Sequence, residues 1–385
     1  MNTVHNQCIN LTMNAPYLKS ILKNSVNTFL KDNQVKVNYY NFDESSPSMV
    51  SDTLKKTKSW QHNFKVPPLG TIPDDEISEN NQFEYPVFSP INMTESDDAI
   101  ILLHGLNERD WEKYGCWAEQ LVLSTGKPVI LFPIAFHMNR SPKNWNNPRD
   151  MIKWVNKDKP ATNLTFANVA LSERMITSPE RFYLFIRETI LNIIQLKEQI
   201  EQGNHPLFKS TCHVDFFCYS IGGLVSQILF QADPYKQFTN SKLFLFCGGG
   251  IFHELNGNSR FIMSGEAFHV LKKYYSNEFE IGDRDAIYYA ACNHFNTNCN
   301  PNERMAYYAT NANRIKIISL KKDSVIPTSS IESCLGSKVA ATCLKEMDFD
   351  LDYSHEIPFP LTKDKSEKAN DMFKVVMTIA SDFLG

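Results

Sequence analysis

The stretch DFFCYSIGGLVSQ, residues 215–227, joins an apolar run to a glycine pair through a single serine, Ser220. The run before Ser220 has the composition of a buried strand, and the residues after it place apolar side chains at helical spacing. A sharp turn from strand to helix raises a serine above the sheet edge and aims the first helix amides at a developing negative charge. The pattern therefore predicts a nucleophile. A serine that only caps the helix has the same local sequence and stays an alternative.

Strand and helix patterns alternate on both sides of this turn. Strands that are apolar on both faces and alternate with helices are typical of a parallel sheet covered by helices on both sides. We therefore expect an α/β fold with a mostly parallel central sheet. The expected strands lie at 98–106, 127–134, 213–220, 242–250 and 314–320, and the expected helices at 111–126, 179–203, 221–231 and about 367–383.

The chain divides into an N-terminal extension, residues 1–95, and a core, residues 96–385. The extension has helical spacing at 15–32, followed by short strand patterns and a proline-rich loop. Two stretches exceed a minimal alternation of strands and helices: an insertion at about 134–176 and an aromatic-rich one at about 251–312. Both follow a strand, which places them at the edge of the sheet where ligands bind in open α/β folds. We expect the second to form a helical cap, with extra packing helices as the alternative.

Composition excludes several kinds of partner. The chain of 385 residues has 39 basic and 43 acidic residues, a net charge of −4, and neither sign forms long blocks. This balance argues against nucleic acid as a partner. The N-terminus lacks the pattern of a signal peptide, and no run approaches the length of a membrane helix. Nine scattered cysteines without C-x-x-C pairs favour reduced thiols. We expect a cytoplasmic protein without an integral membrane segment.

The motif CYSIGG, residues 218–223, resembles the nucleophile elbow of the α/β-hydrolase superfamily, Gly-x-Ser-x-Gly, with Cys218 in place of the first glycine. The segment AIILLHGLNE, residues 99–108, resembles the strand and His-Gly turn of the same superfamily. The resemblance implies an α/β-hydrolase fold and an oxyanion hole formed by the backbone amides of Leu106 and Ile221. It assigns His104 a structural role.

Two later segments complete the resemblance. KKDSVIP, residues 321–327, is similar to the turn that carries the acid, which implies that role for Asp323. DYSHEIPF, residues 352–359, is similar to the loop that carries the base, which implies that role for His355. The order Ser220, Asp323, His355 is that of the superfamily. Alternative acids precede the histidine: Asp348, Asp350 and Asp352.

Other residues offer weaker signals. FPIAFHMNRSPKNW, residues 132–145, follows a strand near the expected site, so His137 and Arg140 are candidate substrate-binding residues, together with Tyr219 beside the serine. Cys292, His294 and Cys299 are soft metal ligands, but their spacing matches no common zinc pattern, and we expect no metal.

The resemblance implies a serine hydrolase that cleaves an ester or related acyl bond without a cofactor. An aromatic cap favours a small-molecule acyl substrate with an apolar group. The whole looks most like a poorly characterised bacterial branch of the superfamily with no assigned reaction. Two alternatives stay open: a catalytically silent binding protein with the same fold, which Cys218 favours, and an acyltransferase that uses the same three side chains.

Overall fold

A computed structural model describes residues 27–29, 34–49, 73–155, 162–277, 279, 284–296, 300–360 and 366–385. Within these residues a nine-stranded sheet has the order β1-β2-β3-β5-β4-β6-β7-β8-β9. The pairs β1–β2, β2–β3 and β3–β5 are antiparallel. All pairs along the remainder of the order, β5-β4-β6-β7-β8-β9, are parallel, so the predicted mostly parallel sheet is confirmed. The strands are β1 (Asn27–Phe29), β2 (Val35–Asp43), β3 (Gln82–Pro90), β4 (Ser96–Leu103), β5 (Val129–Leu131), β6 (Phe208–Tyr219), β7 (Leu243–Phe246), β8 (Ile315–Leu320) and β9 (Leu344–Met347).

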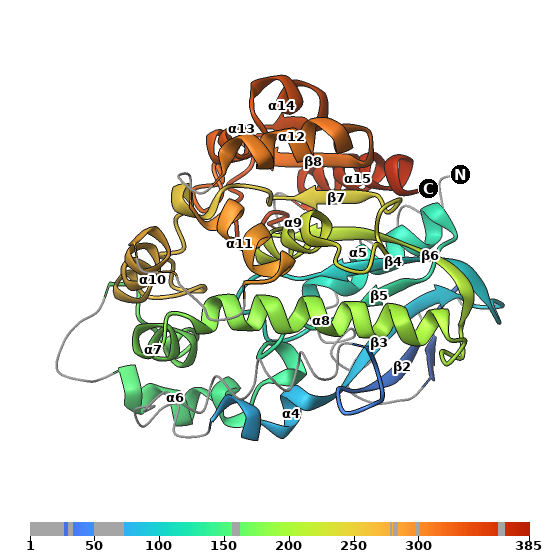
Figure 1. The fold of residues 1–385 in the computed structure, drawn as a ribbon, viewed down its shortest axis with the longest axis horizontal. Helices are drawn as coiled ribbons and strands as arrows, with labels where there is room; N and C mark the ends of the chain where they lie inside the picture. Colours follow the sequence, from blue (N-terminus) through green and yellow to red (C-terminus); the bar gives the residue numbers. More distant parts are fainter. Residues whose placement is uncertain are drawn as a thin grey trace.

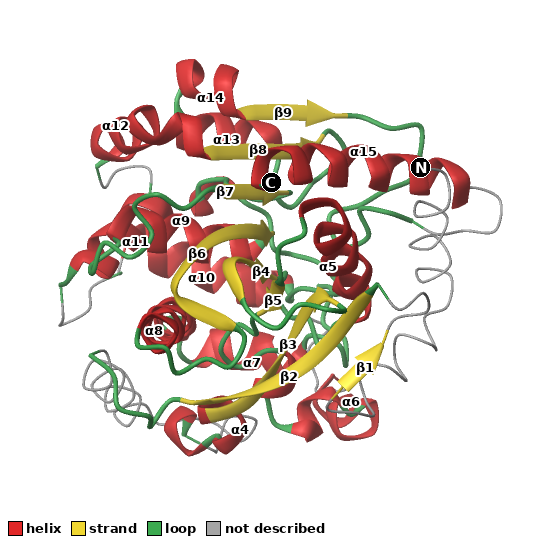
Figure 2. Cartoon of the chain, turned by 90° about the vertical axis from the view of Figure 1, so that its right-hand side faces the viewer, coloured by secondary structure: helices red, strands yellow, loops and turns green. Residues whose placement is uncertain are grey.

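Helices cover both faces of the sheet. The longer helices are α5 (Glu112–Thr125), α6 (Pro148–Val155), α7 (Val169–Thr177), α8 (Arg181–Glu201), α9 (Ile221–Ala232), α10 (Gly265–Asn277), α11 (Ala286–Phe295), α12 (Pro301–Asn311), α13 (Thr328–Leu335), α14 (Ser337–Cys343) and α15 (Ser366–Leu384), and α4 (Ser78–Asn81) is a single turn. Figure 2 shows α5 and α15 on one face and α8, α9 and α11 on the other. The described helices include none that is long and apolar enough to cross a membrane.

The central strands are buried because their side chains alternate between two apolar clusters. On β4, Ile100 and Leu102 pack with α5 and α15, whereas Ile101 and Leu103 pack with α8 and α9. Each of these four side chains is fully buried. Burial of apolar area on both faces explains why the central strands read as continuous hydrophobic runs in the sequence.

The N-terminal part of the described chain extends the same sheet. β2 pairs with β3 along its whole length, and β3 pairs with β5. The helix expected at 15–32 lies outside the described residues except for 27–29, which form β1.

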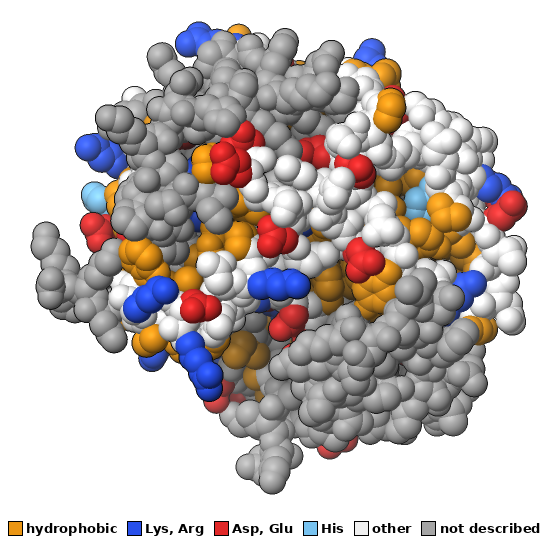
Figure 3. All heavy atoms as spheres, turned by 90° about the horizontal axis from the view of Figure 1, so that it is seen from below, with side chains coloured by type: hydrophobic (Ala, Val, Ile, Leu, Met, Phe, Trp, Pro, Cys, Tyr) orange, Lys and Arg blue, Asp and Glu red, His pale blue; other side chains and the backbone are white. Residues whose placement is uncertain are grey.

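On the face that Figure 3 shows, Lys and Arg side chains are interspersed with Asp and Glu.

The two insertions meet over one end of the sheet. α7 of the first insertion packs against α10 of the second, and Figure 1 shows the two helices side by side. Backbone amides of the second insertion donate to the first: Gly265 N to Thr162 O at 2.9 Å, and Ser264 N to Ser172 Oγ at 3.0 Å. α11, by contrast, packs against the core helix α9. The second insertion thus contributes both a covering helix and a core packing helix.

Candidate active site

Ser220 occupies a strained turn between β6 and α9. Its backbone has φ 55° and ψ −121°, a conformation that L-residues with a side chain rarely adopt. The turn also requires a glycine two residues later, because a Cβ on Gly222 would lie 2.7 Å from Leu103 Cβ and 2.8 Å from Leu103 O. Such strain persists only where the surrounding structure enforces it, and it is concentrated at functional sites.

Cys218, at the position where the motif usually has glycine, fits within the core. It lies in register with Leu103 on the neighbouring strand β4 and is fully buried beside Ser226. Burial raises the pKa of the Cys218 thiol to about 12, so the sulfur is protonated at neutral pH. The cysteine therefore fills space in the elbow without competing with Ser220 as a nucleophile.

A hydrogen-bonded chain joins the three residues predicted from the sequence. Ser220 Oγ lies 2.7 Å from His355 Nε2, and His355 Nδ1 lies 2.7 Å from Asp323 Oδ2. An ionised carboxylate only accepts hydrogen bonds, so Nδ1 carries the hydrogen and Nε2 is free to accept from the serine hydroxyl. The three side chains come from the ends of β6 and β8 and from the loop between β9 and α15. All three are buried.

Backbone amides fix the Asp323 carboxylate. Its Oδ1 accepts hydrogen bonds from Val325 N and Ile326 N, both at 2.9 Å. The other oxygen, Oδ2, is thereby aimed at His355. Two hydrogen bonds from rigid backbone amides set the orientation of the carboxylate.

The alternative acids lie elsewhere. Asp348 accepts from Tyr353 Oη at 2.8 Å and lies 3.4 Å from Lys321 Nζ. Asp350 pairs with Lys368 at the surface, and Asp352 is exposed. Closeness in sequence to the histidine is therefore no guide here, because the loop turns these carboxylates towards other partners.

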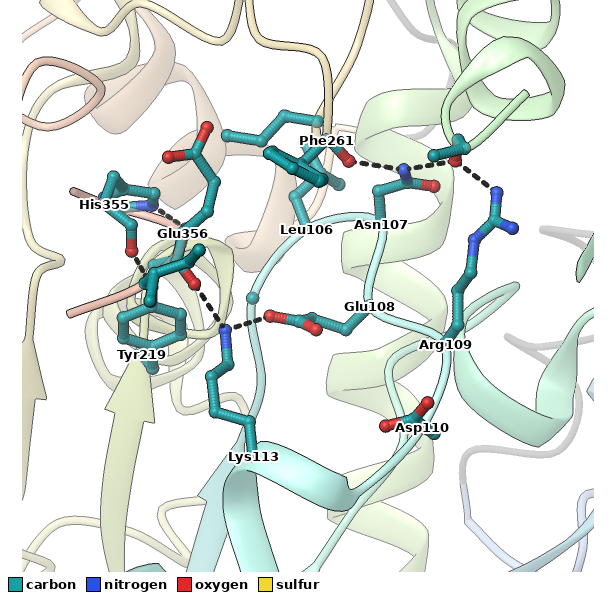
Figure 4. A pocket seen from close by; sticks show the side chains of 15 residues that line it. Leu106, Asn107, Glu108, Arg109, Asp110, Lys113, Tyr219, Phe261, His355 and Glu356 are labelled. Atoms are coloured by element: carbon teal, nitrogen blue, oxygen red, sulfur yellow. Dashed lines mark hydrogen bonds and ion pairs between the residues drawn. The ribbon is translucent and has the colours of Figure 1, made fainter. Parts of the chain in front are cut away.

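Tyr219 contacts the loop that carries His355. Its hydroxyl donates to the backbone carbonyl of His355, and the two rings stack with centroids 5.5 Å apart and an interplanar angle of 18° (Figure 4). Lys113 Nζ lies 4.5 Å from the centre of the Tyr219 ring. Tyr219 also lines the cavity at Ser220, so this predicted substrate-binding residue has a positioning contact that the sequence did not reveal.

The amides of Leu106 and Ile221 lie on two segments that meet at Ser220. Leu106 follows β4, and Ile221 is the first residue of α9. Among the described residues, neither amide donates a hydrogen bond to a protein acceptor. The loop before Leu106 is held by His104, whose Nε2 accepts from Ile134 N at 2.9 Å and whose Nδ1 donates to Gly105 O at 2.8 Å. Burial lowers the pKa of His104, which keeps the ring neutral in this structural role.

Asn107 connects this loop to both insertions, a feature that the sequence analysis missed. Its Nδ2 donates to Ala167 O at 2.8 Å and to Phe261 O at 2.6 Å (Figure 4). The residue has a left-handed backbone, with φ 62°. Asn tolerates that conformation better than most residues, so its position directly after HGL was the available signal.

Two cavities meet at Ser220. The larger, about 290 Å³, has a polar wall that includes Glu108, Lys113 and Glu356. The smaller, about 40 Å³, is lined almost entirely by apolar groups from both sides of the serine, among them Leu106 and Ile262, which also line the larger cavity. The site therefore combines, at the same hydroxyl, an apolar recess and a larger cavity with charged side chains in its wall.

The structure places the other two predicted substrate-binding residues away from Ser220. The Arg140 guanidinium is completely buried and bonds to Glu188 Oε1 at 3.1 Å and to Asn192 Oδ1 at 2.8 Å. It stabilises the core rather than lining either cavity at the serine. His137 lines a third cavity, with its Nδ1 donating to Ala135 O at 2.9 Å. Burial lowers the pKa of His137 to about 4, so this ring is neutral.

The weak metal candidates are not gathered into a site within the described residues. His294 lies on α11, where its ring nitrogens bond to Ala290 O at 2.8 Å and to Tyr308 Oη at 3.0 Å. Cys292 lies on the same helix, and Cys299 falls outside the described residues. The part of the chain that is described contains no group of three or more His, Cys, Asp or Glu side chains arranged to hold a metal ion.

The strand order and the Ser220 turn define an α/β-hydrolase fold, as predicted. Within that class, residues 15–385 match the model of DUF6051, a family of unknown function, and the chain belongs to this family. No curated protein sequence matches the chain.

Solved structures with a similar chain path include several esterases. A cold-adapted esterase from an Arctic intertidal metagenomic library is 10% identical with a TM-score of 0.40, over 94% of this chain and 99% of that one. The esterase domain of a Rhodothermus marinus protein is 7% identical with a TM-score of 0.40, over 91% and 99%. An esterase from Pyrobaculum calidifontis is 9% identical with a TM-score of 0.41, over 89% and 94%.

Proposed function

We propose that this protein is a serine hydrolase that cleaves an ester or related acyl bond of a small molecule. The observation that carries the proposal is the hydrogen-bonded chain from Ser220 through His355 to Asp323, with the serine in a strained turn. A serine hydroxyl becomes nucleophilic when a neighbouring base takes its proton and a third group holds that base in the correct tautomer.

In the proposed mechanism, Ser220 Oγ attacks the carbonyl carbon while His355 Nε2 takes the hydroxyl proton. Asp323 stabilises the imidazolium that forms, and the amides of Leu106 and Ile221 donate to the carbonyl oxygen as it becomes negative. His355 returns the proton to the leaving alcohol, which frees an acyl-enzyme. Water, activated by His355, then adds to the acyl carbon and releases the acid. Each oxyanion donor contributes roughly 3–4 kcal/mol to such reactions.

The apolar recess supports an apolar group at one end of the substrate. Leu224, Phe252 and Phe268 belong to its lining, and burying apolar area there is worth roughly 25 cal/mol per Å². The larger cavity at the serine, whose lining includes the charged side chains of Glu108, Lys113 and Glu356, gives water access to the acyl-enzyme. This arrangement favours esters with an apolar portion of limited size.

A fluorophosphonate probe tests the proposal directly, because it phosphonylates only an activated serine. We expect the folded protein to be labelled and the Ser220→Ala variant to show no labelling at an unchanged melting temperature. Absence of labelling on folded protein would contradict the hydrolase and favour the catalytically silent binding protein instead. Where labelling occurs, product analysis of a turned-over ester with and without an added alcohol acceptor separates hydrolysis from acyl transfer.

A further inference from the structure

A third cavity, about 40 Å³, lies between the first insertion and the N-terminal end of α8. Asn107, Glu108 and Arg109 line both this cavity and the larger one at Ser220. The space is therefore one loop away from the nucleophile. Its innermost lining includes His137, Arg174 and Arg181, and we name it the cationic cavity.

Three buried polar atoms of the cationic cavity have no hydrogen-bond partner among the described residues. They are Arg174 Nη1, Arg181 Nη1 and His137 Nε2, on side chains that are only 3%, 3% and 4% exposed. Buried polar groups in folded proteins are nearly always hydrogen-bonded, because an unmade bond costs the full desolvation of the group. Three such atoms around one cavity indicate a place for a polar ligand.

The charge of the cavity favours an anion. Arg174 and Arg181 share the carboxylate of Asp74: Arg174 Nη2 donates to Oδ1, and Arg181 Nε lies 3.0 Å from Oδ2. Burial, followed by the like charge of Arg174, lowers the pKa of Arg181 to about 10, despite the opposing effects of Asp74 and Glu180. Arginine side chains are cationic in proteins, so two buried positive charges face one directly paired carboxylate.

Aromatic rings hold this arrangement in place. The Arg174 guanidinium lies 4.7 Å from the centre of the Trp145 ring and 5.3 Å from that of Phe136. Stacking on a ring leaves the guanidinium edge directed along its plane, where its N–H groups donate. The neutral ring of His137, whose Nδ1 hydrogen is used by Ala135 O, presents a lone pair at Nε2. The cavity thus combines two donors with one acceptor.

We propose that the cationic cavity binds a carboxylate of the substrate, so that the protein acts on an ester with one apolar end and one acidic end. This inference rests on the proposed function. Arg174 and Arg181 bind the carboxylate through Nη1, and His137 Nε2 accepts a hydrogen bond from a hydroxyl or N–H group beside it. A carboxylate bound there lies beside the segment Asn107–Arg109, which also lines the larger cavity at Ser220.

The test is calorimetric binding of glutarate and of its neutral diamide, glutaramide, to the Ser220→Ala variant, which requires no turnover. We expect glutarate to bind at least about 10-fold more tightly than glutaramide, since hydrogen bonds to charged groups are the stronger kind. Arg181→Gln should weaken glutarate binding by about 10-fold or more. The control Arg149→Gln removes the same charge from an exposed residue of α6 and should leave binding unchanged.

Equal affinity for the two probes would overturn the inference, as would tight glutarate binding to a folded Arg181→Gln variant. If that variant does not fold, the comparison of the two probes still decides. Glutarate binding together with absence of fluorophosphonate labelling would reject the hydrolase and keep the anion site. Labelling without selective glutarate binding would keep the hydrolase and reject the anion site.

Discussion

The hydrogen-bonded side chains at Ser220 and the cationic cavity differ in whether their buried polar groups have partners within the protein. At Ser220 the hydrogen bonds are all made within the protein: Ser220 to His355, His355 to Asp323, and Asp323 to two backbone amides. In the cavity, Arg174 and Arg181 each keep a buried N–H without a partner among the described residues. We infer that the two sites have different roles. The fold orients the reacting groups at Ser220, whereas the unpaired N–H groups in the cationic cavity would form hydrogen bonds with the substrate and so select it.

The largest expected effect concerns the Ser220 chain. His355→Ala should lower kcat by about 10⁶-fold and Asp323→Asn by roughly 10⁴-fold, because a base and its orienting acid act as one unit with the nucleophile. Steady-state turnover of a chromogenic ester measures both. The melting temperature should change little, and glutarate binding should persist in both variants. Full turnover in Asp323→Asn would show that another group orients the histidine.

Arg140 differs from Arg174 and Arg181, because its guanidinium hydrogen-bonds to Glu188 and Asn192 within the core. Arg140→Met removes the guanidinium that forms a buried ion pair with Glu188, so we expect a loss of about 3–5 kcal/mol in the free energy of unfolding. Denaturant titration measures this loss. The ratio of glutarate to glutaramide affinity should not change, because Arg140 does not line the cationic cavity. A changed ratio would mean that the two arginine networks are coupled.

Gly222→Ala tests how firmly the fold holds the nucleophile. The new Cβ would collide with the backbone of Leu103, and relief of such overpacking costs typically 1–3 kcal/mol. We expect lower stability together with a loss of turnover of roughly 10-fold or more, because Ser220 shifts with the turn. Gly223→Ala is the matched control, since its Cβ would approach other atoms no closer than 3.3 Å. Equal losses of stability and turnover in both variants would contradict the conclusion that position 222 in particular must be glycine.

Tyr219→Phe removes one hydrogen bond to the histidine loop. The bond is to backbone and is worth about 1 kcal/mol, so we expect roughly a 5-fold fall in kcat with KM nearly unchanged. Steady-state kinetics over a range of ester concentrations separates the two constants. A rise in KM at constant kcat would instead identify Tyr219 as a substrate-binding residue, as its position in the sequence suggested.

The smallest expected effect concerns Cys218. Its pKa of about 12 leaves only about one thiol in ten thousand ionised at pH 8, and the side chain is fully buried. Treatment of the folded protein with iodoacetamide at pH 8 should therefore leave ester turnover unchanged. Inactivation that coincides with alkylation at Cys218, located by peptide mass spectrometry, would show that the elbow opens to solvent.

The central strands were predictable from the sequence because burial on both faces leaves a local record, an unbroken apolar run. The short strand β9 was not, since its residues Leu344–Met347 are only partly buried and carry no such run. Asn107 was missed for a similar reason: its effect comes from carbonyls of Ala167 and Phe261, which lie far away along the chain. The sequence after HGL could have indicated a left-handed backbone at Asn107, but not which distant carbonyls its side chain contacts.

The sequence by itself determined the alternation of strands and helices and the turn at Ser220, because each depends on neighbours within a few positions. The candidates Asp323 and His355 came instead from the resemblance of two later segments to the superfamily. Only the tertiary structure decided that Asp323, rather than Asp348, faces His355, and that Arg174 and Arg181, rather than Arg140, line a cavity. The physical reason is that a buried charge is oriented by the groups packed around it, and those groups come from distant parts of the chain.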